Sequence, residues 1–183
     1  MALLRQSKPS LIGWVLACLA LAAVRWPQAA LGGALEVGKP FPSVSLVDGD
    51  AREAPAVAKE APLVLVQVWA TWCAPCHEAL PRLLEAVRAE SGGEILVVLW
   101  NIDTELARAK RYLEMRGLAE ASINLRFDPG GREFTRLGAP GMPTTILVSY
   151  GKIVALFAGY SPETERGIVA ALREARRKQQ AGL

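Results

Sequence analysis

Cysteine and histidine are scarce in this sequence. The 183 residues contain three cysteines, Cys18, Cys73 and Cys76, and one histidine, His77. So few cysteines exclude a scaffold held together by several disulfides. A structural zinc site is disfavoured as well, because Cys73, Cys76 and His77 supply at most three of the four ligands that zinc needs. We therefore expect no metal site, and we also expect no cofactor.

Acidic residues are absent before Glu36. Arg5, Lys8 and Arg25 lie in that stretch and account for the whole formal net charge of +3. The rest of the chain is electrically balanced. We therefore expect no nucleic-acid partner.

An apolar run without charges extends from Leu11 to Val24. As a helix it would span roughly 21 Å, less than the ~30 Å hydrocarbon core of a bilayer. This length favours a signal-peptide core, and the small residues after Trp26 offer a cleavage region. A retained membrane anchor stays open. We predict residues 1–34 as signal peptide or anchor, with Cys18 a buried thiol in it, and residues 35–183 as one exported domain. That domain is expected in the periplasm or tethered to the outer face of the cytoplasmic membrane.

Apolar runs typical of buried strands alternate with segments of helical periodicity in the exported part. The run from Pro62 to Ala70 predicts a central strand covered on both faces, and a helix is predicted from about Cys73 to Glu90. A second buried strand ends at Asp103, which we expect to cap the following helix. Gly117 is expected to end that helix.

The C-terminal part reads as a hairpin followed by a helix. Two β-prone runs flank Tyr150 and Gly151, and Ser161 followed by Pro162 is typical of a helix start. Together with the alternating elements before it, this order predicts the α/β class, with a central mixed β-sheet flanked by helices.

Cys73 and Cys76 form a C-x-x-C motif directly after the expected central strand. A cysteine at the start of a helix meets unpaired N–H groups and the positive end of the dipole, which stabilise its thiolate. We therefore interpret Cys73 as the nucleophile of disulfide exchange and Cys76, one turn deeper, as the resolving thiol. Because His77 follows, the letters also fit the C-x-x-C-H motif of haem attachment.

Two motifs carry a family resemblance. VWATWCAPC, residues 68–76, resembles the active site of the thioredoxin superfamily, and GMPTTILV, residues 141–148, resembles its cis-proline loop. The opening residues 37–50 and the additional strand–helix unit 94–117 are similar to the TlpA/ResA-like (CcmG/DsbE-related) branch of exported thiol–disulfide oxidoreductases. The resemblance implies a thioredoxin fold with an extra strand–helix insertion and an N-terminal strand extension.

The resemblance also implies roles for individual residues. Cys73 and Cys76 would form the redox disulfide, and Pro143 would be a cis residue beside them that helps Met142 present its backbone to a substrate strand. Trp72 is interpreted as a recognition residue, and Pro75 is expected to stiffen the turn between the cysteines.

Two positions depart from the family pattern. Gln67 stands where the superfamily often has a buried aspartate that accepts a proton, and Ala79 stands where this branch often has a glutamate. Glu78 lies one residue earlier, rotated by about 100° around the helix. Glu78 and water are the proton acceptors that remain.

The sequence offers three alternatives to disulfide exchange. Haem attachment is disfavoured because it explains neither the buried strand before Cys73 nor the GMPTT motif at residues 141–145. A peroxidase of related fold is disfavoured because Trp69 and Ala70 stand where its threonine should be. A thioredoxin-like binding or metal-delivery module that never cycles its thiols stays open.

The residues between the cysteines suggest the direction of the reaction. Ala74 and Pro75 resemble reducing members, whereas strong oxidants place a histidine there that stabilises the reduced form. We therefore expect an enzyme that reduces disulfides of protein partners, for example in cytochrome c maturation. Its electrons would come from a membrane-embedded donor, and the membrane itself is a partner if the N-terminal segment is retained.

Overall fold

The computed structural model describes residues 34–58, 60–91, 95–120 and 123–181. The expected leader, residues 1–34 with Cys18, lies almost wholly outside these ranges. Within the ranges, no helix is both long and apolar enough to cross a membrane.

A seven-stranded mixed sheet forms the centre of the domain, in the order β2-β1-β5-β4-β3-β6-β7. Strands β3, β4 and β5 are parallel to one another; β6 pairs antiparallel with β3, and β7 pairs antiparallel with β6. The α/β thioredoxin fold expected from the sequence is therefore confirmed. The strands are β1 (Leu46–Val47), β2 (Glu53–Ala54), β3 (Val64–Trp69), β4 (Leu96–Asn101), β5 (Ile123–Phe127), β6 (Thr144–Ser149) and β7 (Lys152–Ala158).

Strand β3 is the most deeply buried part of the sheet. All six of its residues are buried, and it pairs with β4 on one side and β6 on the other. Valine side chains branch at Cβ and pack well on such a doubly covered strand. Gln67 is its one polar residue, and it faces the interior together with Thr145 of β6.

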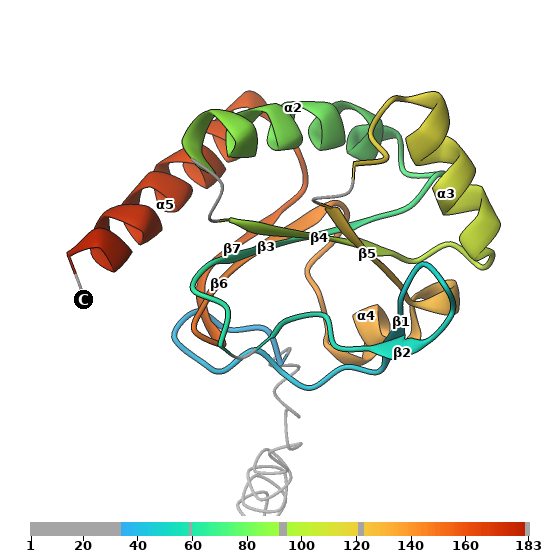
Figure 1. Ribbon diagram of the computed structural model, residues 1–183, viewed down its shortest axis with the longest axis horizontal. Helices are drawn as coiled ribbons and strands as arrows, with labels where there is room; N and C mark the ends of the chain where they lie inside the picture. The colour runs from blue at the N-terminus through green and yellow to red at the C-terminus, as the bar shows by residue number, and fades with distance from the viewer. Residues whose placement is uncertain (1–33, 59, 92–94, 121–122, 182–183) are drawn as a thin grey trace, which may run out of the picture. The chain divides into compact units, whose positions relative to one another are not determined.

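Helices cover both faces of the sheet (Figure 1). Helices α2 and α5 lie side by side over one face, whereas the short α4 lies on the opposite side. Arg173 of α5 and Glu90 of α2 join the two long helices through an ion pair of 2.7 Å. The helices are α2 (Ala74–Ser91), α3 (Leu106–Met115), the short 3-10 helix η2 (Pro129–Gly131), α4 (Arg132–Arg136) and α5 (Pro162–Gln180).

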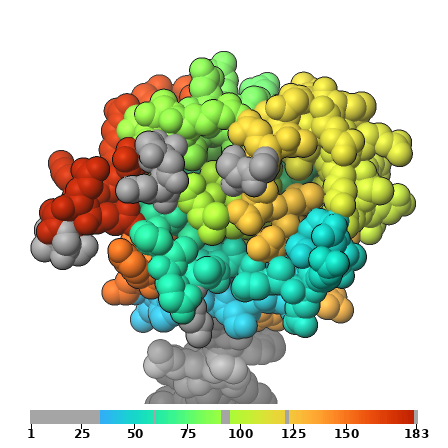
Figure 2. All heavy atoms as spheres, viewed as in Figure 1, coloured from blue at the N-terminus to red at the C-terminus, as the bar shows by residue number. Residues whose placement is uncertain are grey.

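Strand β1 is short, with only 2 residues. Asp48 explains this, because its carboxylate accepts hydrogen bonds from the backbone N–H groups of Asp50 (2.8 Å) and Arg52 (3.0 Å) and turns the chain into β2. The resulting pair lies at one edge of the sheet, beside β5. In the space-filling view these N-terminal strand residues lie against the segment that contains β5 (Figure 2).

The expected turn and helix ends are found at most positions. Tyr150 and Gly151 both have positive φ, as a two-residue hairpin turn requires. The Ser161 hydroxyl accepts a hydrogen bond from the backbone N–H of Thr164 at 3.2 Å and caps α5. Gly117, with φ of 63°, follows the end of α3.

The expected role of Asp103 as a helix cap is wrong. Helix α3 begins after Glu105, which forms no side-chain cap bond. Asp103 is instead buried, with 1% of its surface exposed, and its carboxylate points back to the loop in front of the cysteines. In that loop, the backbone N–H and the hydroxyl of Thr71 donate hydrogen bonds to it.

Candidate active site

Cys73 and Cys76 lie where the central strand passes into a helix. Strand β3 ends at Trp69, three residues form the loop, and α2 begins directly after Cys73. The two cysteines are joined by a disulfide, with their Cα atoms 5.3 Å apart. Cys73 retains 5% of its surface exposed and Cys76 none. An incoming sulfur atom therefore meets Cys73 first, at the positive end of the α2 dipole.

The loop before Cys73 is fixed by a buried carboxylate. Asp103 accepts hydrogen bonds from the backbone N–H of Thr71 (3.2 Å) and from its hydroxyl (2.9 Å). The Asn101 side-chain amide donates a third, at 2.8 Å. Several hydrogen bonds of this kind compensate for burying a charge. The end of β4 thus anchors the loop that carries the disulfide.

His77 is tied to the same loop. The side chain is partly buried, and its Nε2 lies 2.8 Å from the carbonyl oxygen of Thr71. Its ring stacks on Tyr112 of α3, with 5.0 Å between the centroids. His77 therefore links the first turns of α2 to the residues in front of Cys73.

The other expected site residues differ in exposure. Trp72 is 63% exposed beside Cys73, and Pro75 and Glu78 are also exposed. Pro143 is buried, Met142 is partly buried, and the peptide bond between them is cis. Glu78 is thus exposed, whereas Cys76 is fully buried.

A small cavity of about 10 Å³ lies next to the turn of α2 that follows Cys76. Ala79, three residues after Cys76 on the same face of α2, lines this cavity, whereas neither cysteine is among its lining residues. The other residues that matter in its lining are Gln67, Pro143, Thr145, Tyr160 and Glu165. The cavity is large enough for about one water molecule.

Gln67 contributes an unsatisfied amide to this cavity. Its Oε1 accepts a hydrogen bond from the Thr145 hydroxyl at 2.6 Å. Its Nε2 is buried and has no hydrogen-bond partner among the described residues. A buried amide N–H group without a partner is costly, and it indicates that a polar group belongs in the adjoining space.

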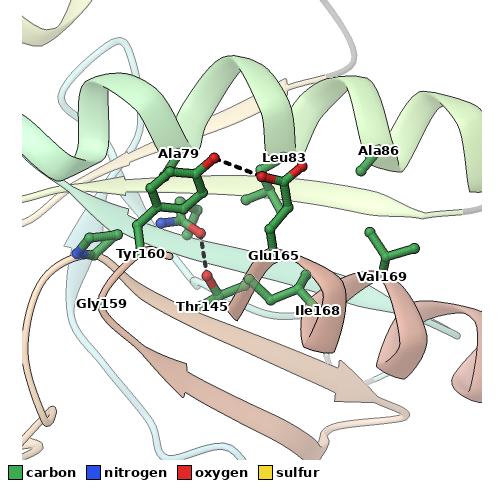
Figure 3. A pocket seen from close by; sticks show the side chains of 11 residues that line it. Ala79, Leu83, Ala86, Thr145, Gly159, Tyr160, Glu165, Ile168 and Val169 are labelled. Carbon is green, nitrogen blue, oxygen red and sulfur yellow. Dashed lines mark hydrogen bonds between the residues drawn. The ribbon is translucent and has the colours of Figure 1, made fainter. Parts of the chain in front are cut away.

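A tyrosine and a glutamate close the cavity on the side of α5. Figure 3 shows the Tyr160 hydroxyl pointing at the Glu165 carboxylate, close to Ala79 and Leu83 of α2. The hydroxyl donates to Glu165 Oε2 at 2.7 Å. Burial, followed by this hydrogen bond, raises the pKa of Tyr160 above its ordinary value of 10.0. The hydroxyl therefore stays a donor at neutral pH and holds the carboxylate in place.

Four residues of this region were not predicted as site residues from the sequence: Thr71, Asp103, Tyr160 and Glu165. A polar residue at the end of a buried strand was a usable signal for Asp103. Nothing in the local sequence indicated Tyr160 and Glu165, because only the packing of α5 beside α2 brings them to the cavity. Within the described ranges, no group of three histidine, cysteine, aspartate or glutamate side chains is placed to hold a metal ion.

Comparisons with known proteins agree with this geometry. The Redoxin family model matches residues 36–172. The thiol:disulfide interchange protein HelX of Rhodobacter capsulatus is 32% identical over 131 residues, which cover 70% of each chain. Thioredoxin of Streptomyces clavuligerus is 46% identical over 66 residues, which cover 36% of this chain but 59% of that protein.

A solved structure extends the comparison to most of the domain. The Chlorobium tepidum protein assigned as thiol:disulfide interchange protein DsbE has a TM-score of 0.67 and 25% identity, and the match covers 77% of this chain and 98% of that one. The chain therefore belongs to the Redoxin family, as a TlpA/ResA-like member of the thioredoxin superfamily with the dithiol of a thiol–disulfide oxidoreductase.

Proposed function

We propose that this protein reduces disulfides in protein partners outside the cytoplasmic membrane, through the Cys73–Cys76 dithiol. The observation that carries the proposal is the unequal placement of the two sulfur atoms. Cys73 is slightly exposed at the start of α2, whereas Cys76 is fully buried one turn further on. This arrangement suits one thiol that attacks and a second that resolves.

The reaction follows from this placement. The Cys73 thiolate attacks one sulfur atom of the substrate disulfide, and the other substrate sulfur leaves as a thiolate. Cys76 then loses its proton and attacks Cys73 Sγ, which forms the Cys73–Cys76 disulfide and releases the second substrate thiolate. Two electrons pass from the dithiol to the substrate, and a dithiol donor must restore the protein for another cycle.

The reducing direction is supported by the residues between the cysteines. Ala74 and Pro75 are both exposed, and neither carries a charge that would stabilise the reduced thiolate. The dithiol form is therefore not specially stabilised, which makes it a ready electron donor. Cytochrome c maturation, where partner cysteines must be kept reduced, is a process that would use such a donor.

The extracytoplasmic location is supported by the apolar N-terminal run from Leu11 to Val24. Glutathione does not buffer that compartment in bacteria, so electrons would come from a membrane-embedded donor. The name of the relative HelX describes a thiol:disulfide interchange protein, and this supports protein thiols and disulfides as the proposed substrates.

Four residues around the disulfide would contact the substrate or hold the site in place for it. We assign the exposed Trp72 to partner contact, since a projecting aromatic side chain supplies apolar area for binding. Met142 would offer its backbone to an extended substrate segment, with Pro143 holding that loop beside the cysteines. Pro75 would keep the turn between Cys73 and Cys76 in place.

Two other functions are less well supported. A binding module that never cycles would not need one accessible and one shielded thiol. Haem attachment would need His77 as an iron ligand, yet its Nε2 is engaged with the Thr71 carbonyl oxygen. Both alternatives predict that no substrate disulfide is exchanged.

Trapping of a mixed disulfide tests the proposed roles. In the native cells, the full-length Cys76→Ser variant should accumulate disulfide-linked partners that a reducing agent releases. The matched control, Cys73→Ser combined with Cys76→Ser, should capture none. Capture by the Cys73→Ser variant and not by Cys76→Ser would reverse the two roles. Capture by neither would reject the exchange cycle.

A further inference from the structure

The resolving step requires Cys76 to lose a proton inside the protein. Its surface is fully buried, so bulk water does not reach it directly. The neighbouring polar position on β3 is the neutral Gln67, and Ala79 faces the same space from α2. Glu78, the carboxylate nearest in the sequence, is exposed. Neither Gln67 nor Ala79 can take up a proton, so a buried acceptor would have to come from another part of the fold.

Glu165 is the carboxylate that lines the cavity. It belongs to the first turn of α5 and shares the cavity lining with Gln67 and Ala79. Tyr160 fixes its orientation through the 2.7 Å hydrogen bond. The unpaired Nε2 of Gln67 is independent support for a polar occupant, since a water molecule in the cavity would satisfy it.

Glu165 also reaches the outside of the molecule. A second depression, which is open to solvent, is lined by Glu78, Arg82, Tyr160, Pro162, Glu165 and Arg166. Tyr160 and Glu165 therefore line both the cavity and this outer depression. A proton taken up by Glu165 from the inside has a short route to bulk water on the other side.

We propose that Glu165, positioned by Tyr160, accepts the proton of Cys76 by way of the cavity and passes it to solvent. When Cys76 attacks the mixed disulfide, its S–H bond breaks and the proton moves through water in the cavity to Glu165. The Cys76–Cys73 bond forms, and the substrate leaves as a thiolate. Glu165 then releases the proton into the outer depression. The inference rests on the proposed disulfide exchange.

The experiment separates the two sulfur-transfer steps. The probe is a symmetric aromatic disulfide with a coloured thiolate product, mixed with the fully reduced full-length chain. All proteins carry Cys18→Ser, so that Cys73 and Cys76 are the only thiols. Attack by Cys73 releases one coloured thiolate, and attack by Cys76 on the mixed disulfide releases the second. Stopped-flow absorbance records both phases between pH 6 and pH 10.

The Glu165→Gln variant keeps an oxygen that accepts from Tyr160 but cannot take up a proton. We expect its second phase to be about 10-fold slower or more near pH 6.5, in the range of general base catalysis. The difference in the rate of the second phase between the variant and the parent protein should shrink as pH rises, because Cys76 then ionises without help from Glu165. The first phase should be unchanged. Gln67→Glu in the Glu165→Gln background should restore much of the rate, since it returns a carboxylate to the same cavity.

Glu163→Gln is the matched control, because Glu163 lies in the same first turn of α5 but is exposed. It should leave both phases unchanged. A Glu165→Gln profile equal to that of the parent protein, or slowed by one factor at every pH, would overturn the inference. A larger effect of Glu78→Gln would assign the proton to Glu78 instead. If the parent protein releases no coloured thiolate through Cys73, the proposed function itself fails.

Discussion

His77 Nε2 lies 2.8 Å from the carbonyl oxygen of Thr71. A carbonyl oxygen only accepts, so this ring nitrogen carries a proton and donates it. On its other side Thr71 is held by the buried carboxylate of Asp103. The loop in front of Cys73 is thus fixed from helix α2 and from the end of β4 together.

Removing the His77 side chain should loosen this loop. The His77→Ala variant loses the hydrogen bond to Thr71 and the stacking on Tyr112, and we expect a loss of about 1–3 kcal/mol in the free energy of unfolding. Urea unfolding of the oxidised protein measures it. Glu85→Ala, an exposed position on the same helix, is the control and should change little. Equal unfolding midpoints for His77→Ala and the parent protein would contradict the role of His77.

Asp103 should matter more for stability. In Asp103→Ala the buried donors of Thr71 and Asn101 lose their acceptor, and leaving them unsatisfied should cost about 3 kcal/mol. Denaturant unfolding followed by circular dichroism provides the value. The exposed Asp50→Ala is the control. If the Asp103 variant were as stable as this control, the anchoring of the loop by β4 would be wrong.

Trp72 should affect partners without affecting the fold. Because its side chain is 63% exposed, Trp72→Ala should leave stability within about 0.5 kcal/mol of the parent. It should slow the reduction of a protein disulfide several-fold while leaving that of a small disulfide unchanged. Tyr150→Ala removes an equally exposed aromatic side chain, 62%, at the far end of β6 from Pro143. Equal effects of the two variants would remove Trp72 from the partner surface.

Tyr160 should make stability depend on pH in the alkaline range. Its pKa in the folded protein is raised above 10.0, first by burial and then by its hydrogen bond to Glu165, with Glu78 adding to the shift and Arg82 opposing it. The folded state thus holds the phenolic proton more tightly than the unfolded state. The resulting stability is complete below pH 10 and is lost as pH rises through the folded pKa.

Comparison with Tyr160→Phe isolates this contribution from other groups that titrate at high pH. We expect the parent protein to be more stable by about 1 kcal/mol or less at pH 8, the value of one partly exposed hydrogen bond. The difference should fall as pH rises above 10. Urea unfolding at a series of pH values measures it, and a difference that stays constant to pH 11 would contradict the assignment.

Local patterns predicted most of the fold. The apolar run between Pro62 and Ala70 contains β3, and the turn at Tyr150 and the start of α5 at Ser161 lie where their residue types indicate. These features depend on neighbours in the sequence. Asp103 was misassigned because its carboxylate could accept hydrogen bonds either from the start of the next helix or from a distant loop. In the structure it accepts them from Thr71, 32 residues earlier in the sequence.

The cavity could not be predicted in the same way. Cys73 and Cys76 can be recognised from the sequence as a redox pair because only two residues separate them. The neutral residues Gln67 and Ala79 can also be recognised, because both lie within a few residues of this pair. Glu165 lies in the helix whose start was predicted from Ser161 and Pro162, and nothing in that local pattern indicates a functional carboxylate. Its position beside Ala79 depends on the packing of α5 against α2, which local periodicity does not specify.

The reduction potential of the Cys73–Cys76 pair tests the proposed direction of electron flow most directly. The full-length chain with Cys18→Ser would be equilibrated against thiol buffers of known potential, and the oxidised fraction measured by alkylation. We predict a value near that of thioredoxin, about −270 mV. A value near about −120 mV, typical of a strong oxidant, would contradict the reductant assignment.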